Sequence, residues 1–262
     1  FGASHITTAG GEFKDHERAR GVRALFADAA TPCRIGGNWA GNCRMMTRPM
    51  RVETAAELLA DKVVHIVGLA SAGLAATGLT ALSAFGRGVG DLVGAAVYSA
   101  GLMAILGCSA AYNMARRSRH RELLRRFDHA AIFLMIAGTY TPFTILALHG
   151  VWAVFMTALV WTIAATGVAL KLILPQRRFE GLSVAIYIAF GWIILLAMGP
   201  LAQSVSLTVL LLVAAGGVVY TAGVVFHAWH RLPFQNAIWH GFVLAAAAIH
   251  FAAVCSVVLA GG

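Results

Sequence analysis

The feature that most constrains this chain is a series of seven apolar runs, each roughly 17–25 residues long, the length a helix needs to cross a bilayer. With 59% hydrophobic and only 12% charged residues, the chain cannot cover a water-soluble domain with a polar coat. A barrel is excluded, because its strands would alternate over about 10 residues. The sequence therefore predicts an all-α, integral membrane, seven-helix bundle. Its spans are expected at about 63–84, 91–113, 128–148, 151–173, 181–198, 204–226 and 237–260.

Lys and Arg predict how the bundle lies in the membrane, because basic residues near the ends of spans are retained on the cytoplasmic side. Nineteen of the 20 belong to the N-terminal segment or to every second loop region, and Arg87 is the exception. We therefore expect a multi-pass protein of the inner (plasma) membrane, with its N-terminus cytoplasmic and its C-terminus outside. The net charge of +9 has the same origin, so we expect membrane lipids as partners and no nucleic acid. The oligomeric state is left open.

Residues 1–54 differ in kind from the rest of the chain. They are mixed in composition and show no apolar periodicity, and Met45, Met46 and Met50 follow a start that is not Met. No central apolar region marks the segment as a signal peptide. We expect it to be disordered, or to result from an upstream start assigned to the reading frame. Residues 55–262 are expected to form the membrane domain.

Polar side chains within the predicted spans mark the candidate site, because such groups are costly in lipid and are often functional. Ser109 and Asn113 close the second span, four residues apart on one helix face. Asp128 opens the third span at the same predicted depth, and Asn236 and His240 open the seventh. Several helices therefore present polar groups near the cytoplasmic boundary.

The first span adds Asp61 and His65 at this depth. Structural roles are the alternatives: Asp128 can stabilise the start of its helix, and His65 can be an interfacial or hydrogen-bonded side chain. His250 lies ten residues beyond His240, about 15 Å deeper, where a histidine is expected to be a hydrogen-bonded core residue.

Packing explains another polar stretch, Gly138 to Pro142 in the third span. The proline bends the helix, and we expect Thr139 and Thr141 to hydrogen-bond the carbonyls that it frees. Gly138 would admit a close neighbour, and Gly216 suggests similarly close packing in the sixth span.

Four segments of this chain resemble the hemolysin III family, the bacterial branch of the progestin and adipoQ receptor superfamily. The resemblance covers about residues 55–260 and is carried by "ADKVVHIVG", "DHAAIFLMIAGTYTPF", "AAGGVVYTAGVVF" and "LPFQNAIWHGFVL". It implies a seven-helix fold with the N-terminus inside. It also implies a zinc ion held by three histidines. One histidine closes a Ser-x-x-x-His motif on the second span, and two belong to a His-x-x-x-His motif on the seventh. The aspartate of the third span is implied to position a bound water. The related alkaline ceramidases imply hydrolysis of lipid amide bonds.

This chain departs from that pattern at two of the three ligand positions. Ser109, Asp128 and His240 are present, but Asn113 and Asn236 stand where the family has histidine. An amide oxygen is a weaker zinc ligand than imidazole, so the sequence predicts a degenerate metal site. His65 or Asp61 would be the substitute ligands if zinc binds. The sequence favours the other alternative, in which Asn113, Asp128, Asn236 and His240 form a closed hydrogen-bonded network without metal.

Two functions follow from these alternatives. The first is a hemolysin III-like protein, associated with cytolysis by family, that binds lipid or affects membrane permeability. The second is a zinc-dependent lipid amide hydrolase, with Asp128 as general base beside Ser109 and with His240 as a metal ligand. The sequence leaves open whether the protein is an enzyme. A retinal protein is excluded, because the last span has no lysine for a Schiff base.

Overall fold

The computed structural model describes residues 53–85, 88–173 and 180–260, and in these residues it contains helices and no strand. Within these ranges, seven helical spans are long and apolar enough to cross a membrane, which confirms the predicted fold class. The predictions for residues 1–52 lie outside the described residues. The spans are α2 (Ala55–Ala84), α3 (Val89–Met114), α4 with η1 (Arg121–Ala147), α5 (Gly150–Ile173), α6 to α7 (Gly181–Ser204), α8 (Leu207–Ala228) and α9 (Gln235–Ala260).

Two spans are not single regular α-helices. The fifth consists of α6 (Glu180–Gly191), the 3₁₀ helix η3 (Trp192–Ala197) and α7 (Met198–Ser204). The third consists of α4 (Arg121–Pro142) followed by the π-helical turn η1 (Phe143–Ala147).

The helices α2 and α4 begin earlier than the hydropathy predicted. For α2 the cause is a capping box: the Thr54 side chain accepts a hydrogen bond from the Glu57 amide at 3.3 Å, and the Glu57 carboxylate accepts one from the Thr54 amide at 2.7 Å. Both bonds satisfy amides that a helix start leaves free. The helix therefore extends about two turns before the apolar run, and α4 likewise starts in the charged residues before its own run.

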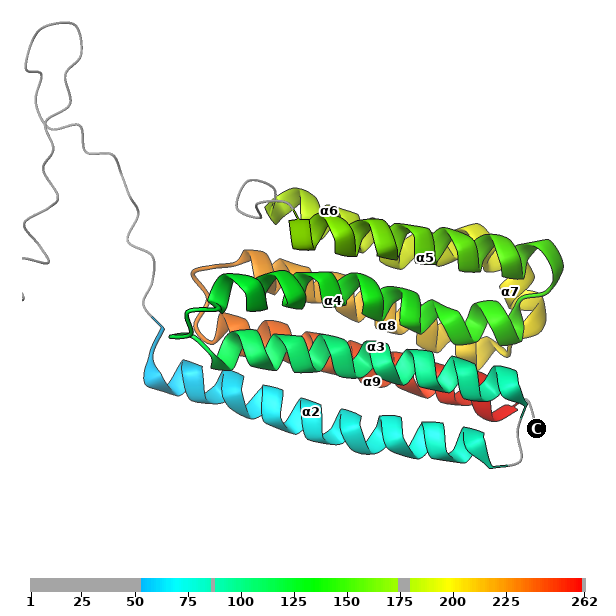
Figure 1. The fold of residues 1–262 in the computed structure, drawn as a ribbon, viewed down its shortest axis with the longest axis horizontal. Helices are drawn as coiled ribbons and strands as arrows, with labels where there is room; N and C mark the ends of the chain where they lie inside the picture. Colours follow the sequence, from blue (N-terminus) through cyan, green and yellow to red (C-terminus); the bar gives the residue numbers. More distant parts are fainter. Residues whose placement is uncertain (1–52, 86–87, 174–179, 261–262) are drawn as a thin grey trace, which may run out of the picture. The chain divides into compact units, whose positions relative to one another are not determined.

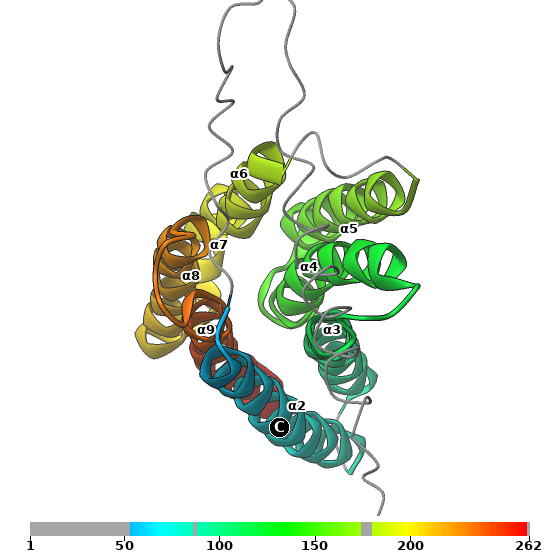
Figure 2. The same ribbon diagram turned by 90° about the vertical axis from the view of Figure 1, so that its left-hand side faces the viewer.

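The first and last spans lie side by side. In Figure 1, α2 runs along α3 and α9, and these contacts are among the most extensive in the molecule. Figure 2 shows α9 between α2 and α8, while α3, α4 and α5 follow one another on the other side. Because successive spans are antiparallel, the starts of α2, α4 and α9 and the end of α3 share one end of the bundle. We call it the α2-start end.

After Pro142 the third span continues as the π-helical turn η1, where the Leu148 amide donates to the Phe143 carbonyl at 3.0 Å. The two threonines do not compensate for the missing donor as we expected. Thr139 and Thr141 each donate to the carbonyl four residues back, at 2.9 and 2.8 Å. A proline at position 142 leaves a different carbonyl unpaired, that of Gly138.

Glycines permit close helix contacts at the predicted positions. A Cβ on Gly138 would lie 3.2 Å from the Val97 carbonyl oxygen of α3. On α8, a Cβ on Gly216 would lie 2.2 Å from the His250 ring of α9. His250 donates from Nε2 to the Val213 carbonyl at 3.1 Å, as expected of a hydrogen-bonded core histidine.

Candidate metal centre

The buried face of α2 is polar at one end and apolar at the other. Its buried residues follow one another at intervals of three or four, so they form a single stripe along the helix. Glu57, Asp61 and His65 occupy the start, at 5%, 3% and 6% exposure. The stripe continues with small and apolar residues, namely Gly68, Ala72, Ala76, Leu79 and Ser83. Three ionisable groups are therefore buried together near the α2-start end.

Asp61 connects the two histidines nearest to it. Its carboxylate oxygen Oδ1 accepts a hydrogen bond from His240 Nδ1 of α9 at 2.6 Å, and its backbone carbonyl accepts one from His65 Nδ1 at 2.8 Å. The two imidazole rings meet edge to face, with centroids 4.2 Å apart. One potential ligand atom from each of these residues lies within 4.8 Å of the other two. We call Asp61, His65 and His240 the Asp61 cluster.

These hydrogen bonds fix the tautomers of both histidines. An acceptor oxygen requires the proton on Nδ1, so each neutral ring presents an unprotonated Nε2. Asp61 therefore orients both imidazoles. A metal ion coordinated by the Asp61 carboxylate and by His240 would replace the proton that these two groups share, because metal ligands must be deprotonated.

Two further helices complete the surroundings. Ser109 of α3 is buried, and its Oγ lies 3.3 Å from His65 Nε2. Asp128 of α4 interacts with the Ser109 hydroxyl and lies near His240. Asn113, one turn after Ser109, donates its amide to the Ser109 carbonyl at 3.0 Å. The structure therefore brings the predicted residues of the first, second and third spans together with His240.

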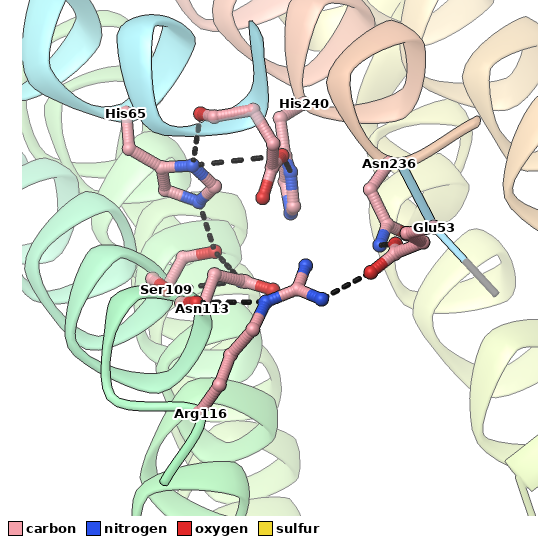
Figure 3. A network of polar contacts seen from close by, with 8 residues as sticks. Glu53, His65, Ser109, Asn113, Arg116, Asn236 and His240 are labelled. Atoms are coloured by element: carbon pink, nitrogen blue, oxygen red, sulfur yellow. Dashed lines mark hydrogen bonds and ion pairs between the residues drawn. The ribbon is translucent and has the colours of Figure 1, made fainter. Parts of the chain in front are cut away.

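Asn236 lies in a separate set of contacts. Its Nδ2 donates to Glu53 Oε1 at 2.6 Å, and the other oxygen of Glu53 accepts from Arg116 Nη1 in the turn after α3. Figure 3 shows Glu53 between Arg116 and Asn236. We call these three residues the Glu53 bridge. It ties the segment before α2 to α3 and α9.

Sequence reasoning missed Glu53, Glu57 and Arg116. Glu57 connects the starts of α2 and α9, because its Oε1 also accepts the Phe234 amide at 2.7 Å. Phe234 has a positive φ of 57°, and this bond satisfies its amide in that uncommon conformation. A signal was present: Glu53, Glu57, Asp61 and His65 recur every four residues. That spacing predicts that the four residues lie on one helix face. Only Asp61 and His65 lie beside or within the apolar run, so hydropathy drew attention to these two alone.

The fold and the site together define a multi-pass, seven-helix membrane protein with a group of ionisable residues that can hold a metal ion. The family model described as Haemolysin-III related matches residues 59–251. The chain therefore belongs to this family, which confirms the resemblance found in its motifs.

Curated relatives agree with this assignment. Hemolysin-3 of Bacillus cereus is 34% identical over 204 residues, which are 78% of this chain and 92% of that protein. The Hemolysin-3 homolog of Bacillus subtilis (strain 168) is 31% identical over 201 residues, 76% of this chain and 92% of that protein. The human monocyte to macrophage differentiation factor is 30% identical over 164 residues, 60% of this chain and 67% of that protein.

The three-histidine zinc site implied by the superfamily does not fit the residues present. Asn113 and Asn236 occupy two of its ligand positions, and their amide nitrogens donate to Ser109 and Glu53. The Asp61 cluster offers a different set, in which α2 supplies two of the three residues. Asp61 and His65 were the substitutes considered from the sequence, and they contact the one family ligand that is retained, His240.

Proposed function

We propose that the Asp61 cluster binds a divalent transition metal, zinc by preference, and that the protein acts on membrane lipids at this centre. One observation supports the proposal above all: two imidazoles and a carboxylate converge within 4.8 Å. Two histidines and one carboxylate form a ligand set that catalytic zinc sites use, with an open position left for substrate or water. Imidazole nitrogen also favours zinc over magnesium or calcium.

The reaction that we propose is hydrolysis of an amide bond in a lipid. A zinc ion in the cluster would supply Lewis-acid polarisation of the substrate carbonyl. Asp128 would take a proton from the attacking water on its carboxylate, and its interaction with Ser109 supports this assignment by fixing the carboxylate beside His240. The partly buried position of the centre would strengthen the electrostatic interactions within it, because the side chain of His240 is only 14% exposed.

Metal content tests the first part of the proposal. Detergent-purified protein, prepared without chelators or a metal-affinity column, is expected to carry one metal ion per chain by elemental analysis. His65→Ala and His240→Ala should each lose it, whereas His149→Ala should retain it. His149 is a suitable control because it is exposed and lies between α4 and α5. Absence of metal from the wild-type protein, or equal metal in all three variants, would refute metal binding at this cluster.

Turnover tests the second part. The full-length protein in mixed micelles should release fatty acid from a ceramide whose acyl chain is fluorescent. Asp128→Asn should lose this activity and keep its metal, because the general base is removed and the ligands remain. A metal-loaded wild-type protein that releases no fatty acid from ceramide would refute the amide-hydrolase assignment while leaving metal binding intact.

Membrane permeabilisation is the second candidate, favoured by the name of the Bacillus cereus relative, Hemolysin-3. Purified protein reconstituted into dye-loaded liposomes provides the test. Leakage that rises with the protein-to-lipid ratio and persists in His240→Ala would support permeabilisation that does not depend on the metal centre. Intact liposomes at high protein content would exclude it.

We also propose that the protein lies in the inner membrane of the cell and that its α2-start end faces the cytoplasm. The basic residues between α3 and α4 support this orientation. A cysteine introduced at Arg119 should be protected from an impermeant maleimide in intact cells, and one at His149 should be labelled. Labelling of the Arg119 position with protection of the His149 position would reverse the assignment.

A further inference from the structure

We infer that Arg116 and Asn236 form a binding site for the phosphodiester group of a phospholipid, and that the Glu53 carboxylate occupies this site in the structure. The site is separate from the Asp61 cluster and does not depend on a metal. It accounts for the Glu53 bridge, which the proposed hydrolysis does not use. It also gives a function to the asparagine at position 236.

The geometry is that of an anion held between two donors. Each oxygen of the Glu53 carboxylate accepts a different hydrogen bond, Oε1 from Asn236 Nδ2 at 2.6 Å and Oε2 from Arg116 Nη1. The donors belong to different parts of the chain, one at the start of α9 and one in the turn after α3. A third segment, just before α2, supplies the acceptor. Two elements of the bundle therefore converge on a single anionic group that comes from outside both of them.

A phosphodiester matches this pair of donors. Like a carboxylate, it carries one negative charge and presents two equivalent oxygens on one central atom. A guanidinium is well suited to such a group, because its planar fork of N–H donors fits phosphate oxygens. Arg116 has five N–H donors, and its bonds to Glu53 and to the Asn113 carbonyl use two of them. Donors therefore remain for a ligand with more acceptor oxygens than a carboxylate.

The replacement of histidine by asparagine at position 236 has a consequence for anion binding. An amide nitrogen donates at any ordinary pH, whereas a neutral imidazole that binds a metal through one nitrogen has a single N–H left. Asn236 directs its donor at Glu53, and His240, one turn later on α9, bonds to Asp61. The start of α9 therefore provides an anion contact and a metal-ligand candidate one helical turn apart.

The position of the site favours a lipid as the source of the anion. The side chains of Arg116 and Glu53 are 34% and 32% exposed, so an external ligand can reach the donors. They lie at the end of the bundle, where the headgroups of a bilayer would surround the helix ends. Exposed apolar side chains lie two residues before each donor in the sequence, Met114 at 41% and Phe234 at 41%. Such residues suit contact with acyl chains.

If Glu53 competes with the lipid phosphate for the same donors, removing its charge should strengthen lipid binding. The measurement is binding of a fluorescent short-chain phosphatidylglycerol to the full-length protein in a neutral detergent. Glu53→Gln is expected to bind about tenfold more tightly than the wild type, and Arg116→Gln about tenfold more weakly, because a charge-assisted hydrogen bond is gained or lost.

Matched controls are Glu122→Gln and Arg119→Gln. Both alter charges at the α2-start end, Glu122 being paired with Arg125 and Arg119 being bonded to His120. Both should bind like the wild type.

Two outcomes would overturn the inference. One is equal phosphatidylglycerol affinity in Glu53→Gln and wild type, which is decisive even if Arg116→Gln fails to fold. The other is equal weakening by Arg116→Gln and Arg119→Gln, which would indicate general charge attraction. Binding of inorganic phosphate is measured in the same way. If Glu53→Gln binds inorganic phosphate but not phosphatidylglycerol, a lipid ligand is rejected. The metal content of the same preparations separates this inference from the proposed function, because Glu53→Gln should leave it unchanged.

Discussion

Replacing Gly216 with alanine should destabilise the protein by removing the space into which His250 fits. The added Cβ would lie 2.2 Å from Cδ2 and 2.3 Å from Nε2 of the imidazole. Carbon atoms normally approach to about 3.5–4.0 Å, so the ring has to move by more than an ångström. Overpacking of this kind costs roughly 1–3 kcal/mol. Movement of the ring also breaks the His250 to Val213 hydrogen bond, which is worth about 1 kcal/mol between membrane helices. The expected loss of unfolding free energy is therefore about 2–4 kcal/mol.

The assay is unfolding in mixed detergent micelles, with a double-mutant cycle. His250→Ala alone should also destabilise, but adding Gly216→Ala to it should cost little, because the imidazole is no longer in the way. A coupling energy of at least about 1 kcal/mol is expected. The matched control is Gly78→Ala in α2, where a Cβ would meet no atom within 4 Å. If Gly216→Ala were as stable as the control, or if the two substitutions were simply additive, the close contact between α8 and α9 would be refuted.

Three other substitutions have expected outcomes. Asp61→Asn keeps an acceptor for His240 but replaces the proposed carboxylate ligand with a weaker, neutral amide. Metal affinity in a chelator-competition titration should fall at least about 10-fold, and an unchanged affinity would contradict the role given to Asp61. Glu57→Ala leaves the Phe234 amide without its acceptor at 2.7 Å, so the free energy of unfolding should fall by about 2–3 kcal/mol. A change within about 0.5 kcal/mol, as for an ordinary surface substitution, would argue against the connection of α2 to α9. The buried Tyr98 hydroxyl has no hydrogen-bond partner in the part of the chain that the structure describes. In the same unfolding assay, Tyr98→Phe should therefore be neutral or stabilising by about 1 kcal/mol. A clear destabilisation would show that the hydroxyl has a partner.

The spans could be predicted because their signal is strong and local. A helix in lipid must be apolar along its whole length, so seven runs in the sequence correspond to seven spans in the structure. The helix starts were less accessible to this reasoning. Hydropathy does not register the charged first turns of α2 and α4, although the Thr54 and Glu57 capping box is a sequence signal for the true start of α2.

The site was predicted in part. Depth in the membrane placed Ser109, Asp128 and His240 at one level, and the structure brings their side chains into one network with His65. Depth alone could not identify the neighbours of each group. Which helix faces which depends on packing along the whole span, and the small residues of the α2 stripe set how closely α2 approaches α3 and α9.

The partner of Asn236 could not have been found in this way. Glu53 lies before α2, in the segment expected to be disordered, and it contacts Asn236 across 183 residues of sequence. The resemblance to the superfamily grouped positions 113, 236 and 240 as metal ligands. With asparagine at two of them, these α9 positions have other partners: Asp61 of α2 bonds His240, and Glu53, just before α2, bonds Asn236.

The central claim is that the residues of the Asp61 cluster, and not positions 113 and 236, hold the metal. X-ray absorption at the zinc edge of the purified, zinc-loaded protein tests it most directly. The predicted result is two imidazole nitrogens at about 2.0–2.1 Å and one carboxylate oxygen at about 2.0–2.2 Å, with one imidazole lost in His65→Ala. A spectrum that is the same in His65→Ala and in wild type would contradict the claim.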